Sequence, residues 1–144
     1  MRRLILLFAS VLTLTLAYAG NDTPIDVSQL PAKAQTFIAT HFPSLKVALA
    51  TVESEVFSKT YDVRFTTGEK LEFNKSGEWT EVNCAQAAVP SALVPEAIST
   101  WVTTHYPEAM ILKIERESRE YEIKLSNRLE VTFDSKFRVI DIDD

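Results

Sequence analysis

The sequence has few glycines and almost no cysteine, and each shortage excludes a class of protein. Three glycines in 144 residues are too few for a glycine-rich phosphate-binding loop or a flexible Gly-rich linker. Cys84 is the only cysteine, so the chain cannot form an internal disulfide. Two interpretations of Cys84 stay open: a partly buried small apolar residue, which we favour, and an intermolecular disulfide in an oxidising compartment.

Catalytic and metal-binding motifs are also missing. The sequence contains no Gly-x-Ser-x-Gly elbow, His-Glu-x-x-His pair, P-loop or Cys-x-x-Cys. The two histidines, His41 and His105, are expected at helix ends, where an imidazole interacts with the last carbonyls. Asp141, Asp143 and Asp144 could bind calcium weakly, but a charged terminus is the simpler interpretation. We therefore predict no catalytic residue, no metal ligand and no cofactor, and a protein that is not an enzyme.

The charge balance narrows the choice of partner. Aspartate and glutamate number 20 against 15 lysines and arginines, a net charge of −5. An acidic surface repels nucleic-acid phosphates and anionic lipid headgroups. The predicted partner is therefore another protein, and not nucleic acid.

The N-terminus has the pattern of a secretory signal peptide. A positive start at Arg2 and Arg3 precedes an apolar run over residues 4–16, and Ala17-Tyr18-Ala19 supplies small residues around a cleavage point. A membrane anchor would need about 20 apolar residues. We predict a signal peptide over residues 1–19, cut after Ala19, and a periplasmic or secreted protein with no stable membrane anchor after cleavage.

Two stretches of the sequence match each other. His41-Phe42-Pro43 corresponds to His105-Tyr106-Pro107 at an offset of 64 residues, and residues 61–73 correspond to 121–133 at an offset of 60. We place the four-residue difference in a loop around residues 54–60, because loops absorb such deletions. The match divides the chain into a first repeat over 20–84, with its core at 25–83, and a second over 85–144, with its core at 89–143.

The periodicity within each stretch predicts its elements. Apolar residues recur at helical spacing over 30–41 and 94–105, and each run ends at a following proline. The pattern then alternates with period two, which indicates half-buried strands. The predicted fold class is α+β: a tandem repeat of one helix plus a four-stranded antiparallel sheet, with the helices backing one face of the sheets.

The double motif resembles a known family. Leu/Val-Pro, His-Phe/Tyr-Pro and Phe-Asn/Asp followed by Gly-x-Trp-x-Glu are similar to the PepSY-like proteins described as β-lactamase-inhibitor-like, over about Ile25 to Asp143. The resemblance implies a small bacterial periplasmic or secreted protein with a β-lactamase-inhibitor-protein-like architecture. The second stretch departs from the motif, with Phe137 in place of Gly77 and Val139 in place of Trp79.

Strand parity suggests a recognition patch. If Val82 and Ile142 point toward the helices, the opposite face of the sheet carries aromatic and charged side chains typical of protein interfaces. These candidate partner-binding residues are Trp79, Phe137, Val139, Arg64, Glu72, Lys124 and Thr132. The alternative is a bulge after Gly77 that resets the phase and buries Trp79.

These observations favour a non-catalytic exported protein-binding module, in particular an inhibitor of a peptidase or other periplasmic enzyme. The alternative is a small-ligand or metal-binding envelope protein; a hydrolase with an unrecognised site ranks last, because no nucleophile has a visible base. Any specific function is expected where the stretches differ, at residues 54–60 and at 77–79 against 137–139.

Overall fold

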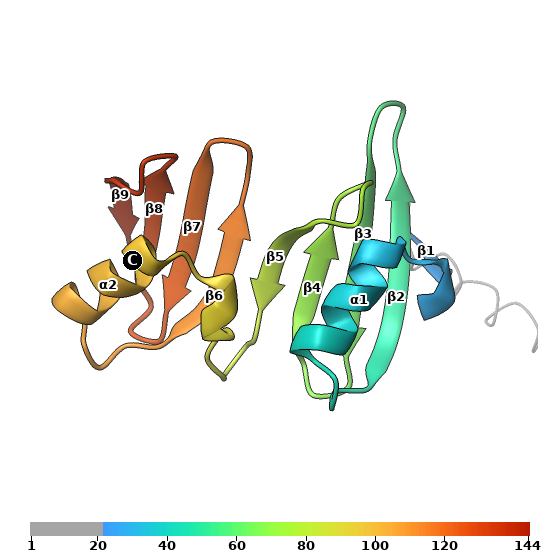
Figure 1. The fold of residues 1–144 in the computed structure, drawn as a ribbon, viewed down its shortest axis with the longest axis horizontal. Helices are drawn as coiled ribbons and strands as arrows, with labels where there is room; N and C mark the ends of the chain where they lie inside the picture. The colour runs from blue at the N-terminus through green and yellow to red at the C-terminus, as the bar shows by residue number, and fades with distance from the viewer. Residues whose placement is uncertain (1–21) are drawn as a thin grey trace, which may run out of the picture.

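The computed structural model describes residues 22–144, which form one antiparallel sheet of nine strands (Figure 1). Each strand pairs with its neighbour in sequence, from β1 to β9. The strands are β1 (Asp22–Ile25), β2 (Val47–Ser54), β3 (Lys59–Phe65), β4 (Lys70–Phe73), β5 (Trp79–Asn83), β6 (Ile111–Arg116), β7 (Glu120–Leu125), β8 (Glu130–Asp134) and β9 (Val139–Asp143). The α-helices are α1 (Ala32–His41) and α2 (Glu96–His105), and each follows a short 3-10 turn, Val27–Gln29 or Ser91–Leu93.

The predicted fold class is wrong. The molecule is mostly a single nine-stranded sheet with two short helices, and not an α+β tandem repeat of helix plus four strands. The strands β5 and β6, which the prediction put in different units, pair directly, with Val82 opposite Ile114. A ninth strand, β1, also extends the sheet beside β2. Period-two alternation identifies a strand but carries no information about which strands pair across a long connection.

Both helices begin and end at the residues that the sequence indicates. Pro31 and Pro95 occupy the N-cap positions, where a missing N–H leaves no helical bond unmade. The last turns end at His41 and His105, immediately before a residue that precedes proline. Proline disfavours the helical conformation of the residue before it, so the chain must leave the helix there.

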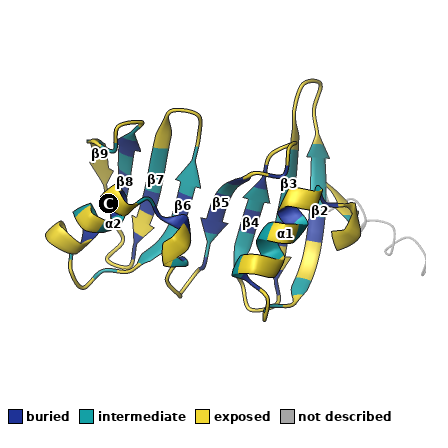
Figure 2. Cartoon of the chain, viewed as in Figure 1, coloured by how far each residue is buried: buried dark blue, intermediate teal, exposed yellow. Residues whose placement is uncertain are grey.

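The hydrophobic core lies between the helices and one face of the sheet, which we call the helix face. The Phe37 ring of α1 lies 5.5 Å from that of Phe73, and the Trp101 ring of α2 lies 5.5 Å from that of Phe133. One cross-strand row on this face is fully buried: Val63, Leu71, Val82, Ile114, Ile123 and Val131. Buried segments accordingly follow the middle of the strands in Figure 2. The opposite, helix-free face is called the open face.

The prediction that a loop holds the four-residue difference between the matching stretches is wrong. The extra residues lie in strands. Val52 pairs with Tyr61, and Arg116 pairs with Tyr121 at the corresponding place. Two further pairs extend only the β2–β3 hairpin: Glu53 with Thr60 and Ser54 with Lys59. Adding two residues to each strand preserves the parity of every side chain. The hairpin is longer, and its tip projects from the body in Figure 1.

Candidate protein-interaction surfaces

The seven residues of the predicted patch divide between the two faces of the sheet. Trp79 is only 8% exposed, and its ring lies 6.4 Å from that of Phe37 in α1. The ring therefore packs under the helix, and the prediction that it lies on the open face is wrong. The Arg116 guanidinium lies over the face of the ring, with its carbon 4.0 Å from the ring centroid, and Nε donates to the Trp79 carbonyl at 2.7 Å.

A bulge explains the error, and it is the alternative considered from the sequence. The β4–β5 register shifts between Glu72 and Phe73, so that Glu72 faces Glu81 while Phe73 faces Trp79. One extra residue on β5 reverses the side on which earlier residues point. The same shift occurs between β8 and β9, where Phe133 faces Val139. Val139 thus lies on the helix face, and the Phe137 ring packs 5.5 Å from Tyr121.

The remaining four predicted residues do lie on the open face, because they alternate with buried core residues. Arg64, Glu72, Lys124 and Thr132 neighbour Val63, Leu71, Ile123 and Val131 in sequence. Whether they contact a partner remains a prediction.

The open face carries two parallel rows of opposite charge, which the sequence-based reasoning missed. The cationic row crosses the sheet at one register level and consists of Arg64, Lys70, Lys113 and Lys124, with Asn83 between the lysines of β4 and β6. The acidic row lies two residues along each strand and consists of Asp62, Glu72, Glu81, Glu115 and Glu122. The strands β3, β4, β6 and β7 therefore each contribute one cation and one carboxylate. The sequence shows which polar positions of each strand are charged. Whether these positions align into rows depends on the register between strands.

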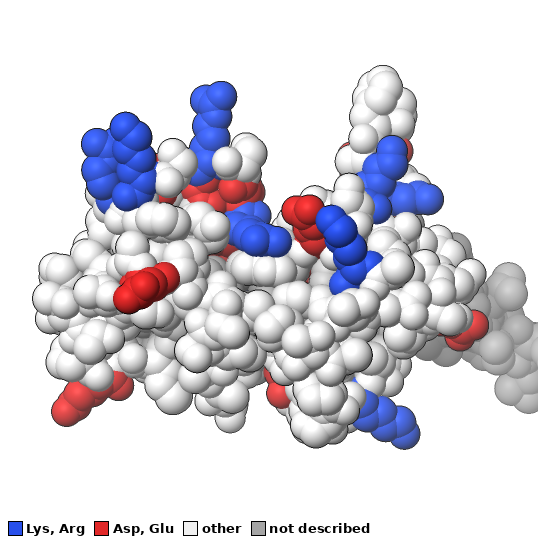
Figure 3. Space-filling model, in the orientation of Figure 1, with Lys and Arg blue, Asp and Glu red and all other residues white. Residues whose placement is uncertain are grey.

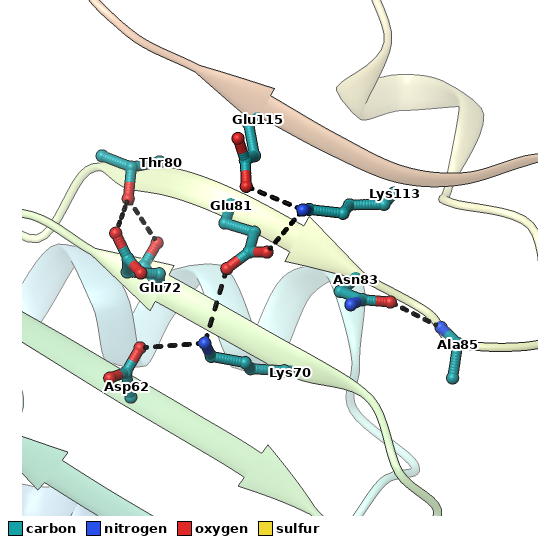
Figure 4. A network of polar contacts seen from close by, with 9 residues as sticks. All are labelled: Asp62, Lys70, Glu72, Thr80, Glu81, Asn83, Ala85, Lys113 and Glu115. Atoms are coloured by element: carbon teal, nitrogen blue, oxygen red, sulfur yellow. Dashed lines mark hydrogen bonds and ion pairs between the residues drawn. The ribbon is translucent and has the colours of Figure 1, made fainter. Parts of the chain in front are cut away.

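The centre of the two rows is joined by ion pairs (Figure 4). Glu81 lies between two lysines, with carboxylate oxygens 3.6 Å from Lys70 Nζ and 3.4 Å from Lys113 Nζ. Lys113 also lies 2.8 Å from Glu115, and Lys70 lies 3.9 Å from Asp62. Figure 4 shows these side chains on the side of the strands away from α1. The network links β3 to β6 and crosses the β5–β6 junction.

Burial, and after it the neighbouring charges, shift the pKa values of three residues in the two rows. Burial raises the pKa of Glu122, and the neighbouring Glu115 and Glu130 carboxylates raise it further. Burial likewise raises the pKa of Asp62, and Lys70 opposes that shift. For Lys113, burial disfavours the charged form, but the hydrogen bond and attraction from Glu115 outweigh it and raise the pKa.

A second candidate surface is the tip of the β2–β3 hairpin. The exposed fractions of Val56 and Phe57 are 87% and 95%. Leaving a phenylalanine side chain in water forgoes about 1.5–3 kcal/mol of burial energy. Figure 3 shows the tip as an uncharged projection with charged side chains at its base. The sequence directed attention to residues 54–60, and the apolar pair within a polar turn was the available signal.

The two histidines and the cysteine pack against neighbouring residues of the fold. The His105 Nδ1 atom lies 2.9 Å from the Trp101 carbonyl, and its ring stacks on Trp101; His41 packs against Phe37. The Cys84 side chain is buried, which confirms the favoured interpretation, and burial followed by the Glu69 charge raises its pKa to about 11. Among residues 22–144, no group of three or more His, Cys, Asp and Glu side chains is placed to hold a metal ion. Within that range, no helix has the length and apolar character needed to cross a membrane.

The fold and these surfaces define a small, mainly β protein that presents a charged sheet face and an apolar hairpin tip. The model of the family described as "Putative beta-lactamase-inhibitor-like, PepSY-like" matches residues 59–141. The chain therefore belongs to this family, as its motifs suggested. A search of curated proteins found no match.

Solved structures of similar proteins are described as periplasmic. A "putative periplasmic protein" from Bacteroides vulgatus is 60% identical, with 88% of this chain and 99% of that chain covered and a TM-score of 0.84. A "putative calcium-regulated periplasmic protein" from Bacteroides thetaiotaomicron is 54% identical, with coverages of 85% and 97% and a TM-score of 0.82. A "putative periplasmic protein of unknown function" from Bacteroides vulgatus is 39% identical, with coverages of 85% and 99% and a TM-score of 0.81. These neighbours support a periplasmic location. The predicted signal peptide lies outside the described residues.

Proposed function

We propose that this family member is a non-catalytic, periplasmic protein-binding module that inserts the β2–β3 hairpin tip into an apolar cleft of its partner. The observation that carries the proposal is the near-complete exposure of Phe57 and Val56. Aromatic side chains dominate the binding energy of protein interfaces when they enter a desolvated pocket. The family's description as β-lactamase-inhibitor-like supports an inhibitor of a peptidase or other periplasmic enzyme as the specific form. The predicted signal peptide would direct export to that compartment, and cleavage after Ala19 would release the chain there.

The surroundings of the tip fit a protein partner better than a lipid surface. Charged side chains of both signs line one pocket with the two apolar residues: Glu55 and Lys59 of the hairpin and Lys75 of the β4–β5 turn. Mixed charge is typical of the polar rim around an interface hot spot. An anionic membrane would instead favour a clearly basic rim.

The chain offers its own control, because the β6–β7 hairpin has Ser118-Arg119 at the corresponding place. The experiment compares capture from a periplasmic extract by wild type, by Val56→Ser/Phe57→Arg, and by Ser118→Val/Arg119→Phe. A partner identified in this way is then titrated by calorimetry and, if it is an enzyme, assayed for inhibition. We expect the first variant to bind at least about tenfold more weakly and the second to bind like wild type.

Two outcomes would overturn the proposal. Equal affinity of wild type and the Val56→Ser/Phe57→Arg variant would show that the tip makes no contact. Tip-dependent binding to vesicles of phosphatidylethanolamine and phosphatidylglycerol, without a protein partner, would make it a membrane-contact element.

Metal or small-ligand binding, the alternative predicted from the sequence, is favoured by one observation, the neighbour described as calcium-regulated. The described residues of this chain do not assemble a metal-binding group, so we assign no calcium ligand. An increase in the melting temperature of this protein on adding calcium chloride, absent with sodium chloride of equal ionic strength, would favour this second function.

A further inference from the structure

The open face carries unpaired charge that the hairpin tip does not explain. The central members of the two rows satisfy one another through Glu81, Lys70 and Lys113. Three of the four outer members do not: within residues 22–144, no ion pair forms at Arg64, Lys124 or Glu122, and the fourth, Asp62, has only the 3.9 Å contact with Lys70. The Oδ1 atom of Asp62 is buried without a hydrogen-bond partner.

Like charges on neighbouring strands destabilise the charged side chains at the outer positions further. Arg64 stands directly opposite Lys70. Lys124 stands between Lys113 on β6 and Glu130 on β8, and it forms no ion pair with Glu130 among residues 22–144. Glu122 stands opposite Glu115. Like charges at opposite positions destabilise a sheet. An external surface that placed carboxylates over the cationic row and cations over the acidic row would relieve all three contacts.

The arrangement of the rows is complementary to itself. The rows flank the level of the buried row Val63, Leu71, Val82, Ile114, Ile123 and Val131. A twofold axis lying over this level and running across the strands exchanges the two rows. The acidic row of the second copy would then lie over the cationic row of the first, and the cationic row of the second over the acidic row of the first. The rotation also preserves the twist of the sheet.

We propose that the open face binds the open face of a second copy of this chain, forming a twofold dimer held by the two charge rows. Each cation then faces the carboxylate two residues away on the same strand of the other copy. The four contacts are Arg64 with Asp62, Lys70 with Glu72, Lys113 with Glu115, and Lys124 with Glu122, and the axis makes each of them twice. On β5, Glu81 of one copy faces Asn83 of the other.

The limits of the contact also follow from the charges. Beyond β7 the level of the cationic row carries carboxylates, Glu130 on β8 and Asp143 on β9, and the other level carries Thr132 and Asp141. Two copies therefore repel each other at that edge. The paired region therefore covers β3 to β7. A twofold axis parallel to the strands would instead set cation over cation, so of these two axes only the one across the strands joins opposite charges. Nucleic acid and anionic lipid are disfavoured occupants, because the acidic row repels phosphate.

The strongest test uses Lys124 and Glu122, which form no ion pair among residues 22–144. Lys124→Glu alone places carboxylate over carboxylate, and Glu122→Lys alone places ammonium over ammonium. Each single variant is expected to associate at least about tenfold more weakly than wild type. An equimolar mixture of the two is expected to form a heterodimer, because both contacts then join opposite charges.

Sedimentation velocity at about 50 mM and about 500 mM salt measures the association. We expect wild type and the mixture to dimerise at low salt and to dissociate at high salt, with circular dichroism showing that both variants fold. Monomeric wild type at low salt overturns the proposal, as does a mixture that stays monomeric or a single variant that dimerises like wild type. The Val56→Ser/Phe57→Arg variant separates this proposal from the previous one, since it is expected to dimerise normally.

Discussion

The β2–β3 and β6–β7 hairpins close in the same way and yet present different chemistry. Glu55 N donates to Ser58 O at 2.9 Å, and Glu117 N donates to Glu120 O at 2.9 Å. The first hairpin is two residues longer on each strand, which lifts its tip by roughly 7 Å, and only this tip is apolar. The shared closing bond reflects a common backbone, so the differences in length and tip composition are where a specific contact would arise.

The β4–β5 and β8–β9 turns make a second comparison. Asn74 Oδ1 accepts the Ser76 and Glu78 amides at 3.0 Å, and Asp134 Oδ1 accepts two amides in the same pattern at 2.9 Å. The turns then place Gly77 at φ 85° and Phe137 at φ 61°. A Cβ at position 77 would lie 2.8 Å from Pro31 Cβ, so the α1 segment excludes any side chain there.

The largest effect is expected from truncating the residues that follow these turns. Trp79→Ala should lower the free energy of unfolding by about 3–5 kcal/mol, because it removes a buried ring under α1. Val139→Ala should cost only about 1 kcal/mol, because Val139 is half-buried and loses two methyl groups. Urea denaturation followed by far-ultraviolet circular dichroism gives both values. Equal costs would mean that the two ends of the sheet are packed alike.

Much of the local structure was predictable, whereas the pairing of distant elements was not. The prolines near α1 and α2 and the alternation around Val63 and Ile123 identify helices and strands correctly, because these signals are local. The β5–β6 junction depends on contacts between distant segments, and the bulge that buries Trp79 shifts the parity by one residue without a distinct sequence signal. The charge rows were missed for the same reason, since their alignment depends on the register of five strands.

A smaller effect is expected at the turns themselves. Gly77→Ala should cost about 1–3 kcal/mol, because a side chain there meets both a left-handed backbone and the Pro31 contact. Phe137→Gly should change stability by less than about 1 kcal/mol, because relief of the positive φ offsets the lost contact with Tyr121. Thermal and urea denaturation of both variants test the difference. A larger loss for Phe137→Gly would show that its ring, and not the α1 contact, dominates these turns.

Shortening the longer hairpin should have a modest effect. Deleting Glu53, Ser54, Lys59 and Thr60 converts β2–β3 to the length of β6–β7 and keeps the parity of the tip. We expect a loss of about 1 kcal/mol, since only exposed or half-buried pairs disappear, and an unchanged circular dichroism spectrum. Deleting only Glu53 and Thr60 is the control, because one residue per strand turns the tip toward the other face. If the four-residue deletion unfolds the protein, the extension is part of the core.

The smallest effect is expected at Glu122, whose folded-state pKa is raised by burial and then by Glu115 and Glu130. A carboxyl group with a raised folded pKa stabilises the fold in its protonated form, and this contribution is lost as the pH rises through that pKa. Glu122→Gln should therefore stabilise the protein at pH 7 by a few tenths of a kcal/mol after solvent screening. The advantage should disappear below about pH 4, near the pKa of an unfolded glutamate.

The matched variant for Glu122→Gln on β3 is Asp62→Asn. The pKa of Asp62 is also raised, by burial first, but Lys70 lies 3.9 Å from Asp62 Oδ1 and opposes the shift. Removing this carboxylate also removes the attraction to Lys70, so the gain should be smaller than for Glu122→Gln. Urea denaturation between pH 4 and pH 7, at a protein concentration low enough to dissociate the proposed dimer, measures both. A pH-independent difference between Glu122→Gln and wild type would mean that crowding of carboxylates does not limit the stability of the sheet at β7.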